Sequence, residues 1–99
     1  MDITAKLELT HKDFINLPWN PNKTHILVGQ ASGHSVNRFN EAGEIMTSNV
    51  KYVEVVDNVV YAITNSASRY ELTNVVLEEV LDMIERLKET HDITVEAYA

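Results

Sequence analysis

The fold is decided by residues 51–64, which read KYVEVVDNVVYAIT. Both halves of this stretch are rich in β-branched and aromatic side chains, which favour strands. Asp57 and Asn58 separate the halves, and both residue types tolerate the left-handed backbone of a two-residue turn. The stretch therefore predicts a β-hairpin. Its register pairs Val56 with Val59, Glu54 with Tyr61, and Tyr52 with Ile63.

A second turn and a helix follow this hairpin. The segment Asn65-Ser66-Ala67-Ser68 is rich in turn residues and returns the chain as residues 69–72, which extends an antiparallel meander. From Thr73 onward the apolar residues recur with a period of 3.6, as in a helix that packs on a sheet. We therefore expect one helix over about residues 74–89, with Thr73 as its N-cap.

The helix should bury one broad apolar stripe. Leu72 and Leu77 occupy the two positions of a hydrophobic staple around the cap. Four stripe residues are expected to be nearly fully buried: Leu77, Val80, Leu81 and Ile84. Residues 92–99 alternate between apolar and polar side chains again, which predicts a closing strand.

The chain before the central hairpin is also mostly strand. Residues 3–9 alternate with a period of two, and residues 24–29 are short and apolar. Residues 35–39 and 44–47 are predicted to form a hairpin around Gly43, which can supply a positive φ.

Two prolines interrupt residues 11–23 and exclude a long helix or a central strand there. We expect a loop that tucks its aromatic residues under the sheet, with Trp19 as a core plug. The chain as a whole reads as one α+β domain of 99 residues. The sheet is expected to be a twisted antiparallel β-meander or a partly closed small barrel, with one helix across it.

Composition and charge exclude several function classes. Eight Lys and Arg against fifteen Asp and Glu give a net charge of −7, which repels nucleic acid and anionic lipid. The basic residues are scattered, and only Arg38, Lys51 and Arg69 could form a folded patch. The chain has no cysteine, which rules out disulfides, thiolate metal sites and cysteine catalysis. No long apolar run or secretory signal is present, so we expect a cytoplasmic protein without membrane contact.

The predicted helix carries a row of carboxylates at spacings of four, three and four. The row consists of Glu78, Asp82, Glu85 and Glu89, and Arg86 could partly neutralise it through Asp82. The simpler interpretation is a solvated helix face on an acidic protein. The alternative is a binding surface for a protein partner with a basic groove, including one that normally receives nucleic-acid phosphates.

A second candidate site is the small, polar segment at residues 29–35. Gly29, Ser32, Gly33, His34 and Ser35 could bind a small ligand with backbone N–H groups or support hydrolysis. The segment lacks the Lys-Ser/Thr of a phosphate-binding loop, so a tight connection between strands is the simpler interpretation.

No metal or cofactor is expected from the sequence. The four histidines, at positions 11, 25, 34 and 91, lie in separate segments, and none stands at helical metal-ligand spacing with another ligand. Any metal site would have to be assembled by the fold.

Three short motifs resemble small uncharacterised proteins of tailed phages: Ile45-Met46-Thr47-Ser48-Asn49-Val50, Ala62-Ile63-Thr64-Asn65-Ser66 and Arg69-Tyr70-Glu71-Leu72. In those proteins a Thr-Ser strand precedes a hairpin that ends in a Thr-Asn-Ser turn and Tyr-x-Leu. The similarity covers about residues 29–72, and Ala67-Ser68 is an insertion relative to the tightest form of the pattern. The resemblance implies an accessory protein that binds and alters a host protein, and it transfers no catalytic residue.

The sequence thus favours a non-enzymatic binding protein that occludes or inhibits a partner. The alternative is a small-ligand-binding or hydrolytic domain that uses residues 29–35.

Overall fold

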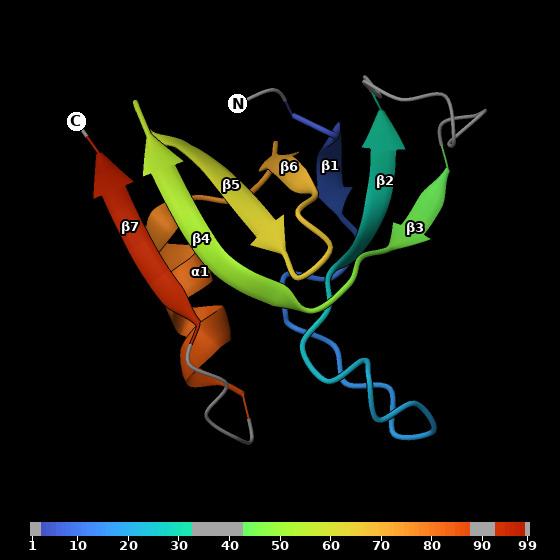
Figure 1. The fold of residues 1–99 in the computed structure, drawn as a ribbon. Coiled ribbons are helices and arrows are strands. Elements are labelled where there is room, and N and C mark those ends of the chain that lie inside the picture. The colour runs from blue at the N-terminus through green and yellow to red at the C-terminus, as the bar shows by residue number, and fades with distance from the viewer. Residues whose placement is uncertain (1–2, 33–42, 88–92, 99) are drawn as a thin grey trace.

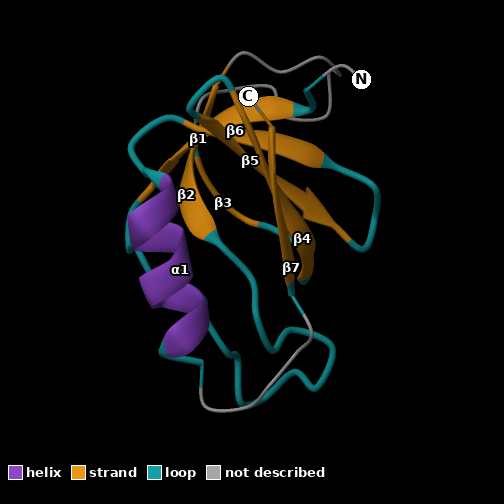
Figure 2. Ribbon diagram, turned by 90° about the vertical axis from the view of Figure 1, so that its left-hand side faces the viewer, coloured by secondary structure: helices purple, strands orange, loops and turns teal. Residues whose placement is uncertain are grey.

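The computed structural model describes residues 3–32, 43–87 and 93–98. They form one mixed sheet of seven strands, and a single helix covers one of its faces (Figures 1 and 2). This confirms the α+β class. The elements in chain order are β1 (Ala5–Leu9), β2 (Val28–Ser32), β3 (Glu44–Met46), β4 (Val50–Val56), β5 (Val59–Thr64), β6 (Arg69–Leu72), α1 (Leu77–Glu85) and β7 (Thr94–Tyr98).

The central hairpin is β4 and β5, and it has the predicted register. Val56 lies opposite Val59, and the two further predicted pairs are present. Asp57 and Asn58 have φ values of 51° and 67°, as a two-residue turn with a left-handed backbone requires. The second turn also forms as predicted, and β6 returns antiparallel to β5.

The strand order corrects the expected antiparallel meander and barrel. The order is β3-β2-β1-β6-β5-β4-β7, so β3 and β7 are the edges of the sheet among the described strands, and these strands do not close into a barrel. Two pairs are parallel: β1 with β6, and β4 with β7. The physical reason for the second pair is α1, which carries the chain across the sheet and returns it in the direction of β6.

The helix is shorter than predicted, and its start differs. It begins after Val76 rather than Thr73, so the predicted N-cap and hydrophobic staple are wrong. Thr73 N–H instead donates to Leu7 O at 3.0 Å. The Asn74 amide accepts from Leu9 N–H at 2.9 Å and donates to Leu9 O at 3.0 Å. These bonds hold the chain along the end of β1, and the helix starts only beyond them. Residues 88–89 of the predicted helix lie outside the described residues.

The core lies between α1 and the sheet. Val80 and Met83 of the helix are each 1% exposed. Leu77 and Ile84 pack against the same cluster but are only half-buried, so the predicted near-complete burial is confirmed for Val80 and wrong for these two. Leu81 is 47% exposed, so its expected burial is wrong. Successive residues of a helix are rotated by about 100°, so Leu81 points to a different side of α1 from Val80 and Met83. The sheet covers only the side that carries Val80 and Met83.

Candidate protein-binding site

Residues 10–27 form an irregular extension that we call the 10–27 hairpin. Ile15 and Ile26 exchange both backbone hydrogen bonds, at 2.9 and 3.0 Å. Nearer the tip, Leu17 N–H donates to Lys23 O at 2.8 Å and Lys23 N–H donates to Asn20 O at 3.0 Å. The segment projects beyond the end of the sheet on the side of β2 and β3 (Figure 1). The predicted strand at residues 24–29 is thus mostly an arm of this hairpin, and β2 begins at Val28.

Polar contacts fix the second arm of the hairpin to the sheet. Asn49 Oδ1 accepts from the main-chain N–H groups of Thr24 and His25, at 3.0 and 3.1 Å. Asn49 Nδ2 donates to Asn22 O at 3.0 Å, and Lys23 Nζ donates to Thr47 O at 3.2 Å. These contacts hold the residues next to the tip, so its position relative to the sheet is set.

Trp19 lies at this tip and is 78% exposed, so its predicted role as a core plug is wrong. Phe14 alone of the two hairpin aromatics packs against the core. The Asn20 N–H donates to Leu17 O at 2.9 Å and closes a tight turn, with Pro18 and Trp19 exposed at its centre. Pro18 is the sequence signal for this turn, because proline favours the second position of a β-turn, but the frequent burial of tryptophan favoured the opposite prediction.

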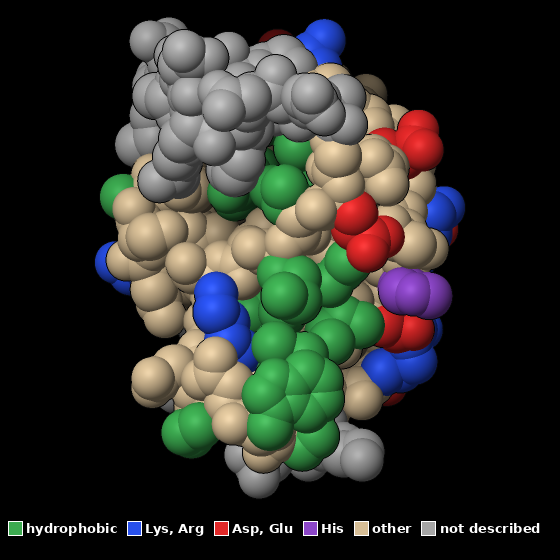
Figure 3. Space-filling view, turned by 90° about the vertical axis from the view of Figure 1, so that its right-hand side faces the viewer, with side chains coloured by type: hydrophobic (Ala, Val, Ile, Leu, Met, Phe, Trp, Pro, Cys, Tyr) green, Lys and Arg blue, Asp and Glu red, His purple; other side chains and the backbone are tan. Residues whose placement is uncertain are grey.

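The surface beside the hairpin is also apolar. Met46 of the edge strand β3 is 58% exposed, and next to it along the chain Thr47 accepts the Lys23 contact. Figure 3 shows hydrophobic side chains gathered in a patch on the side of the molecule that carries β3 and the 10–27 hairpin. Trp19 and Met46 are the two most exposed large hydrophobic residues of the described chain. No pattern in the sequence indicates that the 10–27 hairpin and β3 lie on the same side of the molecule (Figure 1).

The segment proposed as a ligand loop is strand where the structure describes it. Gly29 and Ser32 belong to β2, so the loop prediction is wrong for residues 29–32. A Cβ at Gly29 would run into the Glu8 carbonyl group, so this glycine serves the close approach of β1. Gly33, His34 and Ser35 lie outside the described residues, as does the predicted strand at 35–39.

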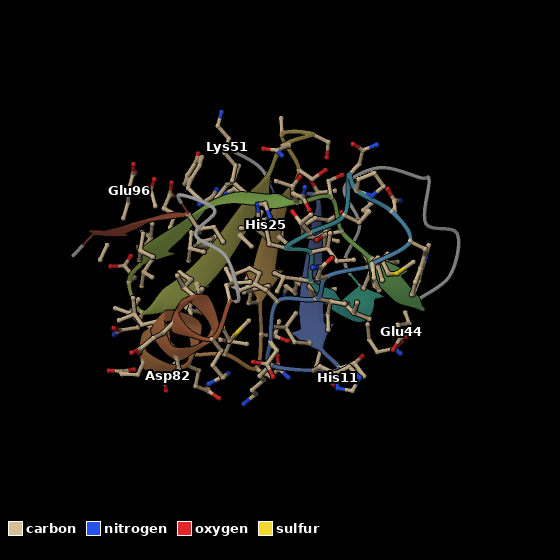
Figure 4. All side chains as sticks on the ribbon, turned by 90° about the horizontal axis from the view of Figure 1, so that it is seen from below. His11, His25, Glu44, Lys51, Asp82 and Glu96 are labelled. Atoms are coloured by element: carbon tan, nitrogen blue, oxygen red, sulfur yellow. The ribbon has the colours of Figure 1, made fainter. Side chains whose placement is uncertain are left out.

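The acidic row is solvent-exposed in its described part. Glu78, Asp82 and Glu85 are exposed, and Asp82 stands on the outer side of α1 (Figure 4). Leu81 is exposed on the flank of the same row. Glu89 lies outside the described residues.

Two ion pairs join α1 to the hairpin. Lys12 Nζ lies 2.8 Å from Glu79 Oε2, and Arg86 Nε lies 2.6 Å from Asp13 Oδ1. Arg86 therefore pairs with Asp13, which corrects the expectation that it neutralises Asp82. The Lys12 hydrogen bond, and next the Val76 N–H, hold the pKa of Glu79 below its usual value.

Residues of the first two of the three short motifs meet where β4 begins and β5 ends. Asn65 N–H donates to Asn49 O at 2.9 Å, Thr64 Oγ1 lies 2.9 Å from Ser66 Oγ, and Ser66 Oγ donates to Ser48 Oγ at 3.3 Å. These hydroxyl groups bond to one another and close the end of the β4–β5 hairpin. The cluster has a clear structural role.

Of the three basic residues that could form a patch, Arg69 is paired with an acidic residue. Arg69 Nη2 lies 3.0 Å from Glu54 Oε1, and its guanidinium stacks over Tyr61 at 4.0 Å. Arg38 lies outside the described residues, which leaves Lys51 exposed on β4.

In the described part of the chain, the histidines and carboxylates do not gather into a metal site. No three His, Asp or Glu side chains there are placed to share a metal ion. His11 and His25 lie in separate parts of the molecule (Figure 4). No helix in the same part has the length and apolar character of a membrane span.

No family model, curated protein or solved structure matches this chain.

Proposed function

We propose that this chain is a non-enzymatic binding protein whose main contact is the surface around Trp19. In the form implied by the resemblance, it is a phage accessory protein that occludes or inhibits a host protein. The observation that carries the proposal is the exposure of Trp19, 78%, at a tip whose neighbouring residues are hydrogen-bonded to the connection between β3 and β4. Water around so large an apolar side chain is released when a partner covers it.

The anchoring of the tip also favours binding. A tryptophan on a rigid support loses little conformational entropy when it enters a partner's pocket. Tryptophan is among the residue types that contribute most to protein interfaces. The hydrogen bonds from the Asn49 side chain to residues 22, 24 and 25 supply such a support. Met46 extends the apolar area beside it.

The outer face of α1 is a second candidate contact for the same function. Leu81 is 47% exposed on the flank of Glu78, Asp82 and Glu85. An apolar side chain beside charges of one sign suits a partner with a basic rim around an apolar pocket.

The test compares proteins retained from a bacterial lysate by immobilised wild type and by Trp19→Ala. We expect one retained protein to be lost, or to bind about 30-fold more weakly, with Trp19→Ala. Trp19→Phe is the matched control and should keep part of the affinity. Because Trp19 is exposed, both variants should unfold within about 0.5 kcal/mol of the wild type. Identical retention by all three chains contradicts the proposal.

The helix candidate is tested in the same assay by the double variant Glu78→Lys and Glu85→Lys. If α1 is the contact, the reversal slows association with the retained protein and flattens its salt dependence. The fold should stay intact, because the change replaces like-charge neighbours with opposite ones. Unaltered association at about 0.05 M salt assigns the row to an ordinary solvated face.

A further inference from the structure

We propose that the free edge of β3 accepts an extended segment of a positively charged partner as an eighth strand of the sheet. The inference rests on the proposed function and specifies how the partner is held. The proposed contact consists of main-chain hydrogen bonds at β3, which are separate from the side-chain contact of Trp19.

The hydrogen bonds between β2 and β3 show which residues of β3 face inward. Thr47 N–H donates to Leu27 O at 2.9 Å, and Ala31 N–H donates to Gly43 O at 3.0 Å. Ile45 lies midway and in register with β2. Residues 43, 45 and 47 therefore direct their main-chain groups toward β2.

The intervening residues direct theirs the other way. Glu44 and Met46 are one residue out of phase, so their N–H and C=O groups point away from β2. β3 is the last strand in the sheet order, so no described strand lies on that side. An extended chain presents its own N–H and C=O groups at the same two-residue interval, whereas a helix does not. The occupant that fits is a strand.

The side chains of β3 favour the addition of a partner strand at this edge. Exposed edges are ordinarily protected by charged side chains, and each edge strand exposes one glutamate, Glu96 on β7 and Glu44 on β3. β3 also exposes Met46 at 58%, and β3 lies on the side of the sheet from which the 10–27 hairpin projects (Figure 1). An added strand beside Met46 would bury this apolar surface.

Charge selects the kind of partner. The chain has a net charge of −7, and Glu44 is exposed on β3, where it accepts from Thr10 Oγ1 at 2.9 Å. A second copy of the chain would bring another −7 and a second Glu44 to the same edge. A segment rich in Lys or Arg between apolar residues is attracted instead.

The probe is a displayed library of random twelve-residue peptides, selected on the full chain. We expect enrichment of basic peptides with alternating apolar residues. Amide hydrogen exchange then locates the best peptide on the unaltered protein. The Glu44 and Met46 amides should exchange quickly in the free chain and at least about tenfold more slowly with peptide, while Ile45 is protected in both states.

Two variants at one position test the main-chain contact. Met46→Pro removes an outward N–H and no bond to β2, so it should retain the fold and weaken the peptide about tenfold or more. Met46→Ala removes the side chain but keeps the N–H, and it should weaken the peptide less. If Met46→Pro fails to fold, the protection of the Glu44 and Met46 amides in the wild type still shows whether the peptide binds at this edge.

Three results overturn the proposal. The first is the absence of any enriched peptide. The second is binding that Trp19→Ala abolishes while the Glu44 and Met46 amides stay unprotected, which leaves the proposed function standing. The third is concentration-dependent protection of both amides without peptide, which identifies a second copy as the occupant.

Discussion

Single side chains decide where the elements of this protein start and which surfaces it exposes. Asn74 is the clearest case, because its amide group imitates a peptide unit and pairs with both main-chain groups of Leu9. That pairing keeps residues 73–74 beside β1, although their sequence fits a helix start. Pro18 has a similar effect, because it favours the tight turn from Leu17 to Asn20, and this turn exposes Trp19, a residue type that is usually buried.

The Lys12–Glu79 pair gives a residue-scale prediction with a defined sign. The pKa of Glu79 lies below its ordinary value of 4.5, and the Lys12 hydrogen bond is the main cause. A lowered pKa in the folded state adds stability above the unfolded-state pKa, and this is lost as pH falls through the folded value. We therefore expect Lys12→Met to raise the Glu79 pKa toward 4.5. The wild type should be the more stable chain near neutral pH, and this advantage should disappear in acid.

The measurement is an NMR titration of the Glu79 carboxyl carbon in both chains, together with urea unfolding at several pH values. Equal titration midpoints in the wild type and in Lys12→Met would show that the pair does not form in solution.

At the scale of elements, local signals were enough for the hairpins and insufficient for the helix face. The β4–β5 register follows from the two runs of β-branched residues and from Asp57-Asn58, whose left-handed φ values match the predicted turn. The helix period was also correct. The broad apolar stripe, however, does not predict which of its residues are fully buried, because that depends on how the helix is rotated on the sheet.

The different burial of Leu81 and Met83 predicts different losses of stability on substitution by alanine. Met83 is 1% exposed and Leu81 is 47% exposed, on the same short helix. We expect Met83→Ala to lower the free energy of unfolding by about 2 to 5 kcal/mol, because it leaves a cavity. Leu81→Ala should cost less than about 1 kcal/mol. Urea denaturation of the two matched variants measures both values, and a larger loss at Leu81 would place the helix in a different rotation on the sheet.

At the scale of the whole molecule, the sequence could not supply the strand order. Neighbours in sequence pair through short turns, whereas β1 with β6 and β4 with β7 are brought together by long connections whose paths no local pattern records. The candidate binding site also depends on the strand order. Residues 10–27 and 44–46 come together because β2 lies between β1 and β3, and the sequence alone showed two unrelated segments.

The most direct test of Trp19 as the main contact uses the fact that the chain has one tryptophan. Incorporation of 5-fluorotryptophan gives a single fluorine NMR resonance, whose shift between H2O and D2O reports solvent contact. In the free protein this solvent shift should be close to that of an exposed indole. On addition of the protein retained from the lysate, the resonance should move and lose most of its solvent shift. A complex that forms while the resonance and its solvent shift stay unchanged would contradict the assignment of Trp19 to the interface.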